Sequence, residues 1–222
     1  MIAVQAVVFD LDGTLVDSLQ DITTSVNGVL SRHGRRVLSV GEIRGLVGWG
    51  LASLVISATT DHPFSPQELA LVLAELREDY KRHPMDSAVY PGIEQLVSFL
   101  SAKTHLGVLS NKDESMTKQV VSKLIAGKPF DAVRGSRVGV ANKPDPTSLL
   151  ALLSEWKVDP ARTVYLGDSE VDMETAVRAG VIPCGAAWGF RTVQELEESG
   201  ARYVFASASK FQKWLESETI LE

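Results

Sequence analysis

The sequence has a single cysteine, Cys184, and this excludes an intramolecular disulfide. No histidine stands beside it, so a small buried thiol is a better interpretation than a nucleophile. The chain also lacks any apolar run approaching the ~20 residues that a membrane span needs. Its start lacks the charged and then apolar pattern of a secretory signal, because Met1 leads directly into a strand-like segment. We therefore expect a cytoplasmic protein.

Positive charge is also scarce in this chain. The formal net charge is -6 and the isoelectric point is near 5.3, whereas nucleic-acid-binding proteins present basic patches. We therefore expect neither nucleic acid nor membrane as a partner, and the composition leaves the choice between monomer and homodimer open. Apolar residues make up 45% of the chain, which is enough for a core that needs no disulfide or structural metal.

Residues 15–87 have helical character and almost no strand signal. The apolar side chains from Leu19 to Leu30 follow helical spacing. Ser39 and Ser65 each stand three residues before a glutamate, which is the pattern of a capping box at the start of a helix. The apolar residues from Leu69 to Tyr80 then form one continuous helical stripe. We predict an all-helical domain over this stretch, inserted after the first strand.

From Val89 onward, short apolar segments alternate with helical patterns. The strand candidates read HLGVLS, FDAVRG, TVYLGD, VIPCGAA and ARYVFA, and a first strand at Val4–Phe9 would join them. Such alternation predicts βαβ units and a parallel sheet with helices on both faces. The expected fold class is therefore α/β, with a Rossmann-like core over residues 1–14 and 88–222. In such sheets the chemistry lies at the carboxyl ends of the strands.

Polar residues stand where these candidate strands end. In the segment AVVFDLDGTLVDS, Asp10 and Asp12 are two residues apart, so their side chains share one face if the backbone stays extended. Like charges that close together cost free energy unless a proton or a cation lies between them. The later strand ends carry further polar residues, namely Ser110 and Asn111 in GVLSNK, Lys143 in ANKPDP, and Gly167, Asp168, Ser169 and Asp172 in VYLGDSEVDM.

This set of residues suits an enzyme that hydrolyses a phosphate ester, because it combines carboxylates, small hydrogen-bonding side chains and one cation. Asp10, placed directly after the apolar strand, is the best nucleophile, because a carboxylate can split the reaction into two steps through an acyl phosphate. Asp12 would give a proton to the leaving oxygen and later take one from water. A divalent cation such as Mg²⁺ would relieve the crowding of negative charge. Lys143, Ser110 and Asn111 would bind the phosphate oxygens.

Four motifs support this interpretation by resemblance. FDLDGTLVDS, LSNK, KPDP and GDSEVDM, in this order, resemble the motifs of the haloacid dehalogenase superfamily, and the helical insertion resembles its C1 cap. Stretches such as VDSLQDITTSVNGVL and AAWGFRTVQELEESGARYVF are similar to phosphoglycolate phosphatases within that superfamily. The resemblance implies a Mg²⁺-dependent phosphatase that forms an aspartyl-phosphate and acts on a small phosphorylated metabolite, with 2-phosphoglycolate as the first expectation.

The resemblance also implies roles for individual residues. Mg²⁺ would be held by the Asp10 carboxylate, the Asp12 backbone carbonyl and the Asp168 carboxylate. Asp172 would act through water or by orienting its neighbours. Thr14 would stabilise its own turn by a local hydrogen bond, and Gly13 would let the backbone approach the phosphate. The carboxylate of phosphoglycolate would need a nearby cation, for which the sequence offers Arg44.

Other functions stay open at this point. A phosphosugar mutase similar to β-phosphoglucomutase would usually carry a residue other than threonine at the position of Thr14. A pyrophosphatase or nucleotidase would share the four motifs, because substrate choice depends on cap residues. The halide-releasing branch lacks the second aspartate, here Asp12. A phosphoacceptor or binding module similar to a receiver domain would need neither a general acid nor a helical lid.

Overall fold

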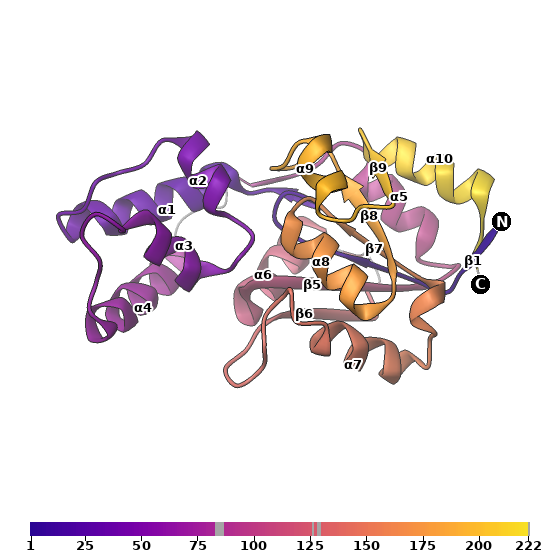
Figure 1. Ribbon diagram of the computed structural model, residues 1–222, viewed down its shortest axis with the longest axis horizontal. Helices are drawn as coiled ribbons and strands as arrows, with labels where there is room; N and C mark the ends of the chain where they lie inside the picture. Colours follow the sequence, from indigo (N-terminus) through magenta and orange to yellow (C-terminus); the bar gives the residue numbers. More distant parts are fainter. Residues whose placement is uncertain (83–86, 126, 128–129, 222) are drawn as a thin grey trace.

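The computed structural model describes residues 1–82, 87–125, 127 and 130–221, and it separates into two parts (Figure 1). A module of helices forms one end of the molecule, and a sheet covered by helices forms the other. The two termini lie together at the far end of the sheet part, where β1 (Ile2–Val4) pairs in parallel with β10 (Thr219–Leu221).

The larger part is built on a sheet whose strand order among the described residues is β6-β5-β2-β7-β8-β9, and neighbouring strands are parallel throughout. The strands are β2 (Ala6–Phe9), β5 (His105–Asp113), β6 (Ala132–Ser136), β7 (Thr163–Gly167), β8 (Ile182–Ala186) and β9 (Tyr203–Phe205). Because β2 lies between β5 and β7, the strand order reverses beside it, and such a reversal creates a crevice at the carboxyl end.

Helices cover both faces of this sheet. They are α5 (Ile93–Leu100), α6 (Glu114–Leu124), α7 (Thr147–Trp156), α8 (Glu170–Ala179), α9 (Val193–Glu198) and α10 (Ala208–Glu218), with a short 3-10 turn, η1 (Pro160–Arg162). Val7 and Phe9 of β2 pack into a hydrophobic cluster with α5, α6 and α10, whereas Ala6 and Val8 pack into a second cluster with α7 and α8. Successive side chains of a strand point to opposite faces, so the predicted α/β architecture is confirmed.

The first strand departs from its prediction in one respect. The sequence indicated one strand over Val4–Phe9, but the structure divides this segment at Gln5. The backbone N–H of Gln5 donates to the carbonyl oxygen of Arg162 at 2.8 Å, so the residues before it leave the main sheet. They pair instead with the last strand of the described chain.

The helical module contains α1 (Leu19–Arg32), α2 (Val40–Leu46), α3 (Leu51–Ala58) and α4 (Pro66–Arg82). Ser39 begins α2 with a capping box, in which its hydroxyl accepts from the N–H of Glu42 and the Glu42 carboxylate accepts from the N–H of Ser39. Ser65 and Glu68 form the same pair of bonds before α4. These caps satisfy N–H groups that a helix start would otherwise leave unbonded.

The chain enters and leaves the helical module side by side. β3 (Val16–Asp17) pairs antiparallel with β4 (Ala88–Val89), and the N–H of Tyr90 donates to the carbonyl oxygen of Leu15 at 3.0 Å. The cap domain is expected over residues 15–87, and residues 83–86 just before its end lie outside the described residues.

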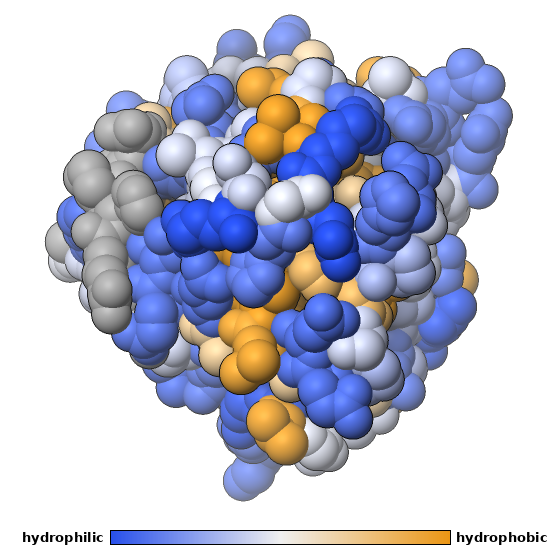
Figure 2. Space-filling view, turned by 90° about the vertical axis from the view of Figure 1, so that its left-hand side faces the viewer, coloured by the Kyte–Doolittle hydropathy of each residue, from blue (hydrophilic) through white to orange (hydrophobic). Residues whose placement is uncertain are grey.

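The outer end of the helical module is mainly hydrophilic with small apolar patches (Figure 2). Ile56 and Leu71 are among the exposed apolar side chains of the module. Within the described ranges, none of the helices combines the length and the apolar character that crossing a membrane requires.

Candidate active site

Asp10 lies at the carboxyl end of the central strand. Its N–H donates to the carbonyl oxygen of Leu166 in β7 at 2.9 Å, which continues the sheet pairing one residue beyond β2. The side chain is buried, with 6% exposure. Asp168 directly follows β7, and Ser110 belongs to β5 on the other side. The reversal in strand order therefore brings three of the predicted site residues to one edge of the sheet.

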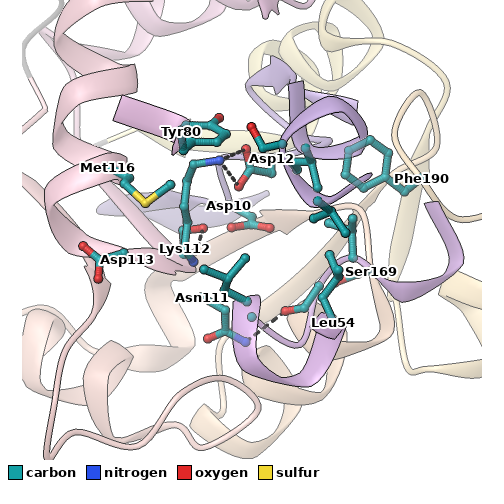
Figure 3. Close-up of a pocket in the computed structure, with 18 of the residues that line it drawn as sticks. Asp10, Asp12, Leu54, Tyr80, Asn111, Lys112, Asp113, Met116, Ser169 and Phe190 are labelled. Carbon is teal, nitrogen blue, oxygen red and sulfur yellow. Dashed lines mark hydrogen bonds and ion pairs between the residues drawn. The ribbon is translucent and has the colours of Figure 1, made fainter. Parts of the chain in front are cut away.

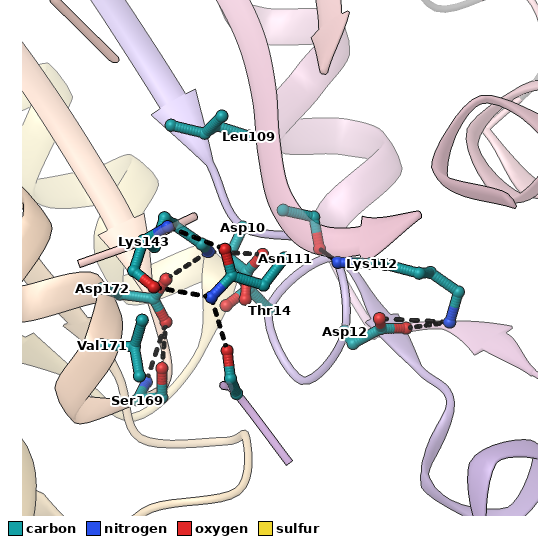
Figure 4. A network of polar contacts seen from close by, with 12 residues as sticks. Asp10, Asp12, Thr14, Leu109, Asn111, Lys112, Lys143, Ser169, Val171 and Asp172 are labelled. Atoms are coloured by element: carbon teal, nitrogen blue, oxygen red, sulfur yellow. Dashed lines mark hydrogen bonds and ion pairs between the residues drawn. The ribbon is translucent and has the colours of Figure 1, made fainter. Parts of the chain in front are cut away.

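Three buried carboxylates gather at this edge. Asp10, Asp168 and Asp172 each offer one oxygen, and these oxygens lie within 4.8 Å of one another. Lys143 stands among them, with its Nζ 2.9 Å from Asp10 Oδ1 and 2.7 Å from Asp172 Oδ1 (Figure 4). Its ammonium also donates to the hydroxyl of Tyr165 at 3.1 Å. One buried cation thus faces three buried carboxylates.

The imbalance of charge shifts the acidity of these groups. The pKa of Asp10 is raised to about 7, because burial and the charge of Asp172 raise it by more than Lys143 lowers it. Burial also raises the pKa of Asp168 well above its ordinary value, with Asp172 and Asp10 adding to the effect. Burial alone would lower the pKa of Lys143, but the two carboxylates beside it hold that pKa well above its ordinary value. Lys143 therefore stays charged.

The donor set fits a hard divalent cation. Asp10 Oδ1 is buried and accepts no well-directed hydrogen bond from the described residues, although Lys143 Nζ is near enough for an ion pair. Carboxylate oxygens are the ligands that Mg²⁺ prefers, and a cation would relieve the repulsion that raises the two pKa values. Asp10 and Asp168 are the carboxylates that would hold it.

The oxygens of Asp168 and Asp172 are held in place by their neighbours. Thr14 Oγ1 donates to Asp168 Oδ1 at 2.9 Å, and the N–H of Phe190 donates to Asp168 Oδ2 at 2.8 Å. Thr14 thus bonds to a distant strand end, whereas the sequence suggested a bond within its own turn. Asp172 Oδ2 accepts from both the N–H and the hydroxyl of Ser169, at 3.0 and 2.6 Å. Since its other oxygen accepts from Lys143, Asp172 fixes the position of that lysine.

Two glycines allow this close packing. Gly13 has φ +86°, in the left-handed region that suits glycine, and a Cβ there would overlap the carboxylate of Asp168. A Cβ at Gly189 would overlap the carbonyl oxygen of Gly13 and the Asp168 side chain. The lack of a side chain at Gly13 therefore lets its backbone pack against Asp168. That the Gly13 backbone also approaches a bound phosphate stays a prediction.

Asp12 lines the same pocket as Asp10 but is paired with a different lysine. Both of its oxygens accept from Lys112 Nζ, at 3.0 and 3.1 Å (Figure 4). Ser18 also donates to its Oδ1, at 2.6 Å. β2 ends at Phe9 and Asp12 forms an isolated bridge with Val16, so the shared face of Asp10 and Asp12 stays a prediction. The buried carboxylate cluster around Asp10 also contains Asp168 and Asp172.

Lys112 is a site residue that the sequence reasoning missed. The Lys112 ammonium lies 4.3 Å from the ring centroid of Tyr80, which comes from α4 of the helical module (Figure 3). Burial acts to lower the pKa of Lys112, but Asp12 and Tyr80 together outweigh burial and the pKa is raised. Its place directly after Ser110 and Asn111, near the carboxyl end of the strand β5 adjacent to β2, was the available signal.

Ser110 and Asn111 have different surroundings. The Ser110 hydroxyl accepts from the N–H of Lys112 at 3.2 Å and lines the pocket above Asp10. The amide of Asn111 donates to the carbonyls of Lys143 and Gly48, at 2.9 and 3.0 Å, and its oxygen accepts from the N–H of Lys143. Asn111 thus holds the Lys143 loop, and its amide is bonded to protein backbone.

Comparison with known proteins identifies the family of this chain. Residues 7–186 match the model of the family described as haloacid dehalogenase-like hydrolase. The chain belongs to that family. This membership confirms the resemblance found in the four motifs, and the chain is therefore a hydrolase of the haloacid dehalogenase-like type.

Curated relatives of this hydrolase include phosphoglycolate phosphatases. It is 34% identical over 201 residues to one from Cereibacter sphaeroides, with 87% of this chain and 91% of the relative covered. It is 32% identical over 219 residues to one from Rhodospirillum rubrum, with 95% and 90% covered. A solved structure described as a predicted phosphatase from Clostridium acetobutylicum matches with a TM-score of 0.87 and 27% identity, covering 96% of this chain and 99% of that chain. These relatives support a phosphatase.

Two arginines of the hydrolase join the helical module to the sheet part. Arg44 of α2 donates to the carbonyls of Phe190 and Gly189, at 2.7 and 2.8 Å. Arg191 donates in return to the carbonyls of Arg44 and Val47, at 2.8 and 3.0 Å. We call this pair of arginines the interdomain clamp. The guanidinium of Arg44, which the sequence offered as a cation for a substrate carboxylate, bonds to a loop of the sheet part, and Arg44 is not among the residues that line the pocket.

A pocket lies between the two parts of this hydrolase, over the carboxyl end of β2 (Figure 3). Polar side chains of the sheet part form its floor, among them Asp10, Asp12, Ser110, Asn111, Lys112 and Asp168. The helical module supplies most of its opposite wall, with Ile22, Val26, Leu51, Leu54, Leu76 and Tyr80. The pocket therefore joins a charged floor to a largely apolar wall.

Proposed function

We propose that this hydrolase is a Mg²⁺-dependent phosphatase that hydrolyses small phosphomonoesters through an aspartyl-phosphate on Asp10. The observation that carries the proposal is the state of the Asp10 carboxylate. It is buried at the strand end, it faces the pocket, and its Oδ1 accepts no directed hydrogen bond from the described residues. A carboxylate oxygen that the protein holds through an ion pair with Lys143, without a directed hydrogen bond, is suited to attack phosphorus from this position.

The residues of the chain account for both halves of the reaction. An oxygen of Asp10 forms a bond to phosphorus while the bond from phosphorus to the ester oxygen breaks, and protonated Asp12 gives its proton to the departing alcohol. Water then attacks the same phosphorus, Asp12 takes the proton from that water, and the bond to Asp10 breaks. Phosphate leaves and the Asp10 carboxylate is restored.

Positive charge supports the transferring group. Lys143 lies 2.9 Å from Asp10 Oδ1, so its fixed charge is close to any phosphoryl group that Asp10 receives. Ser110 presents a hydroxyl to the same pocket. When bound by Asp10 and Asp168, with the Asp12 carbonyl, Mg²⁺ would supply further positive charge to the phosphate oxygens.

The first substrate to test is 2-phosphoglycolate, because curated relatives at 34% and 32% identity carry the name phosphoglycolate phosphatase. Purified protein should release phosphate from a panel that also includes sugar phosphates, nucleotides and pyrophosphate, and chelation of Mg²⁺ should stop the release. An isomerised sugar phosphate in place of free phosphate would indicate a mutase.

Asp10→Asn tests the nucleophile directly. The variant should lose turnover while its circular dichroism stays that of the wild type, and wild-type protein quenched in acid during turnover should carry one added phosphoryl group on Asp10 by mass spectrometry. If wild-type protein with Mg²⁺ releases phosphate from no ester in the panel, the proposed function is wrong.

A further inference from the structure

We infer that the leaving group accepted by this hydrolase is a neutral alcohol with an apolar carbon skeleton, and that a second anionic group on the substrate is disfavoured. This inference rests on the proposed phosphatase activity. It concerns the leaving group, which is the part of the substrate other than the phosphoryl group beside Asp10. It predicts that this chain prefers other esters to phosphoglycolate, the substrate in the names of its relatives.

The wall that would meet the leaving group is mainly apolar, although Ser25 and Tyr80 also bring hydroxyl groups to it. Val26 of α1, Leu54 of α3 and Leu76 of α4 line the pocket from the helical module and are buried, with 1%, 4% and 2% exposure. Tyr80 and Met116 extend this surface, and Met116 comes from α6 of the sheet part. Burying hydrocarbon against such a wall is favourable, whereas a carboxylate placed there would lose its hydration and meet no cation among the described residues that the helical module contributes to the lining.

Among the described residues, the side chains that line the pocket offer no uncommitted cation to a second anion. Of the described residues that line it, Lys112 alone is a cation, whereas the acidic ones are Asp10, Asp12, Asp113 and Asp168. Lys112 is committed to both oxygens of Asp12. A substrate carboxylate would have to share the charge of Lys112 with Asp12, and two carboxylates that close together repel each other.

The arginines near the pocket are also committed. Both members of the interdomain clamp bond to backbone carbonyls, and Arg191 also forms an ion pair with Glu170 at 2.8 Å. Arg77 of α4 lies 3.3 Å from Asp113. None of these three arginines lines the pocket. The cation that the sequence reasoning sought for a substrate carboxylate is therefore not supplied by Arg44.

Matched esters test the inference. n-Propyl phosphate and 2-phosphoglycolate have leaving groups of similar size that differ in charge, and the amide of 2-phosphoglycolate is a neutral isostere. The wild type with Mg²⁺ should give a kcat/KM for propyl phosphate and for the amide at least about tenfold above that for 2-phosphoglycolate, since a buried group left unpaired costs this much or more. A kcat/KM for 2-phosphoglycolate equal to or above those of both neutral esters would overturn the inference.

A variant can supply the missing charge. Leu51 begins α3, lines the pocket and is only partly buried, so Leu51→Lys should tolerate the ammonium. This variant should raise the kcat/KM for 2-phosphoglycolate relative to that for n-propyl phosphate by about fivefold or more. Leu71→Lys is the matched control, because Leu71 is 69% exposed and is outside the pocket lining, and it should leave the ratio unchanged. An equal shift in both variants would contradict the inference.

Failure of the inference is distinguishable from failure of the proposed function. p-Nitrophenyl phosphate carries a good leaving group, so it reports the chemistry at Asp10 with little demand on the general acid. Turnover of this ester combined with a preference for 2-phosphoglycolate would support the phosphatase activity and contradict the inference of a neutral leaving group. No turnover of any ester would contradict both the proposed function and the inference.

Discussion

Lys112 bridges both oxygens of Asp12, and Tyr80 from the helical module covers the same ammonium. Ser18, which directly precedes α1, adds a hydrogen bond to Asp12 at 2.6 Å. The proposed general acid is therefore held by groups from both sides of the boundary between the helical module and the sheet. Any change in the position of the helical module would alter the surroundings of Asp12.

Replacing Lys112 should impair the proton transfer assigned to Asp12. In Lys112→Met we expect kcat for an alkyl phosphate to fall by about 10- to 100-fold, because the carboxylate loses the group that positions it. The loss should be much smaller for p-nitrophenyl phosphate, whose leaving oxygen needs little protonation. Steady-state kinetics with both esters check this, and Lys112→Arg should recover part of the loss. An equal loss on both esters would contradict a role through Asp12.

The raised pKa of Asp10 predicts a dependence of stability on pH. The folded-state pKa of Asp10 is about 7, which is above its ordinary value of 3.8. At a pH between these two values, the Asp10 carboxyl is protonated in the folded protein but ionised in the unfolded chain. Metal-free protein should therefore lose stability as the pH rises from about 4 to about 7, by at most about 4 kcal/mol from this group. Thermal melts across this range should show a smaller loss in Asp10→Asn.

Asp61→Asn is the matched control for that measurement, because Asp61 is an exposed aspartate of the helical module. Its melting curve should follow the wild type at every pH. Added Mg²⁺ should raise the Tm of the wild type more at pH 8 than at pH 5, because a carboxylate must lose its proton to hold a cation. A wild-type Tm that rises with pH over the window in metal-free buffer would contradict the assigned state of Asp10.

The glycine at position 189 should tolerate no side chain. Gly189→Ala would push a methyl group into the Gly13 carbonyl and Asp168, so we expect a destabilisation of about 1–3 kcal/mol and at least a tenfold loss of activity. Gly45→Ala is the control, since a Cβ there meets no atom within 4 Å and Gly45 lies in α2. That change should stabilise slightly. Chemical denaturation and phosphate release measure both effects, and a fully active Gly189→Ala would refute the packing argument.

Breaking the interdomain clamp should loosen the helical module. Arg191→Met removes the donor to the Arg44 and Val47 carbonyls and leaves Glu170 without its cation, so we expect a loss of about 1–3 kcal/mol. Hydrogen exchange should rise in α2 and KM should increase. Arg36→Met is the control, because that arginine is an exposed partner of Glu42 within the module. Unchanged exchange in α2 would show that the clamp does not hold the two parts together.

Much of the fold could be predicted from local pattern. The alternation of short apolar runs with helical stripes indicated the parallel sheet, and the serine–glutamate pairs at Ser39 and Ser65 marked helix starts that the structure contains. The division of the first strand at Gln5 was not predicted, because it depends on Arg162 and on the last strand of the described chain, both distant in sequence.

The sequence by itself determined the family and the residues that gather at the strand ends, because strand periodicity and motif order are local properties that survive without coordinates. The tertiary structure alone decided which of these residues face one another. It paired Asp12 with Lys112 and Asp172 with Lys143, it turned Arg44 toward backbone carbonyls, and it set an apolar wall over the carboxylates. Such pairings depend on how distant segments pack and on which charges burial forces together, and no spacing along the chain encodes them.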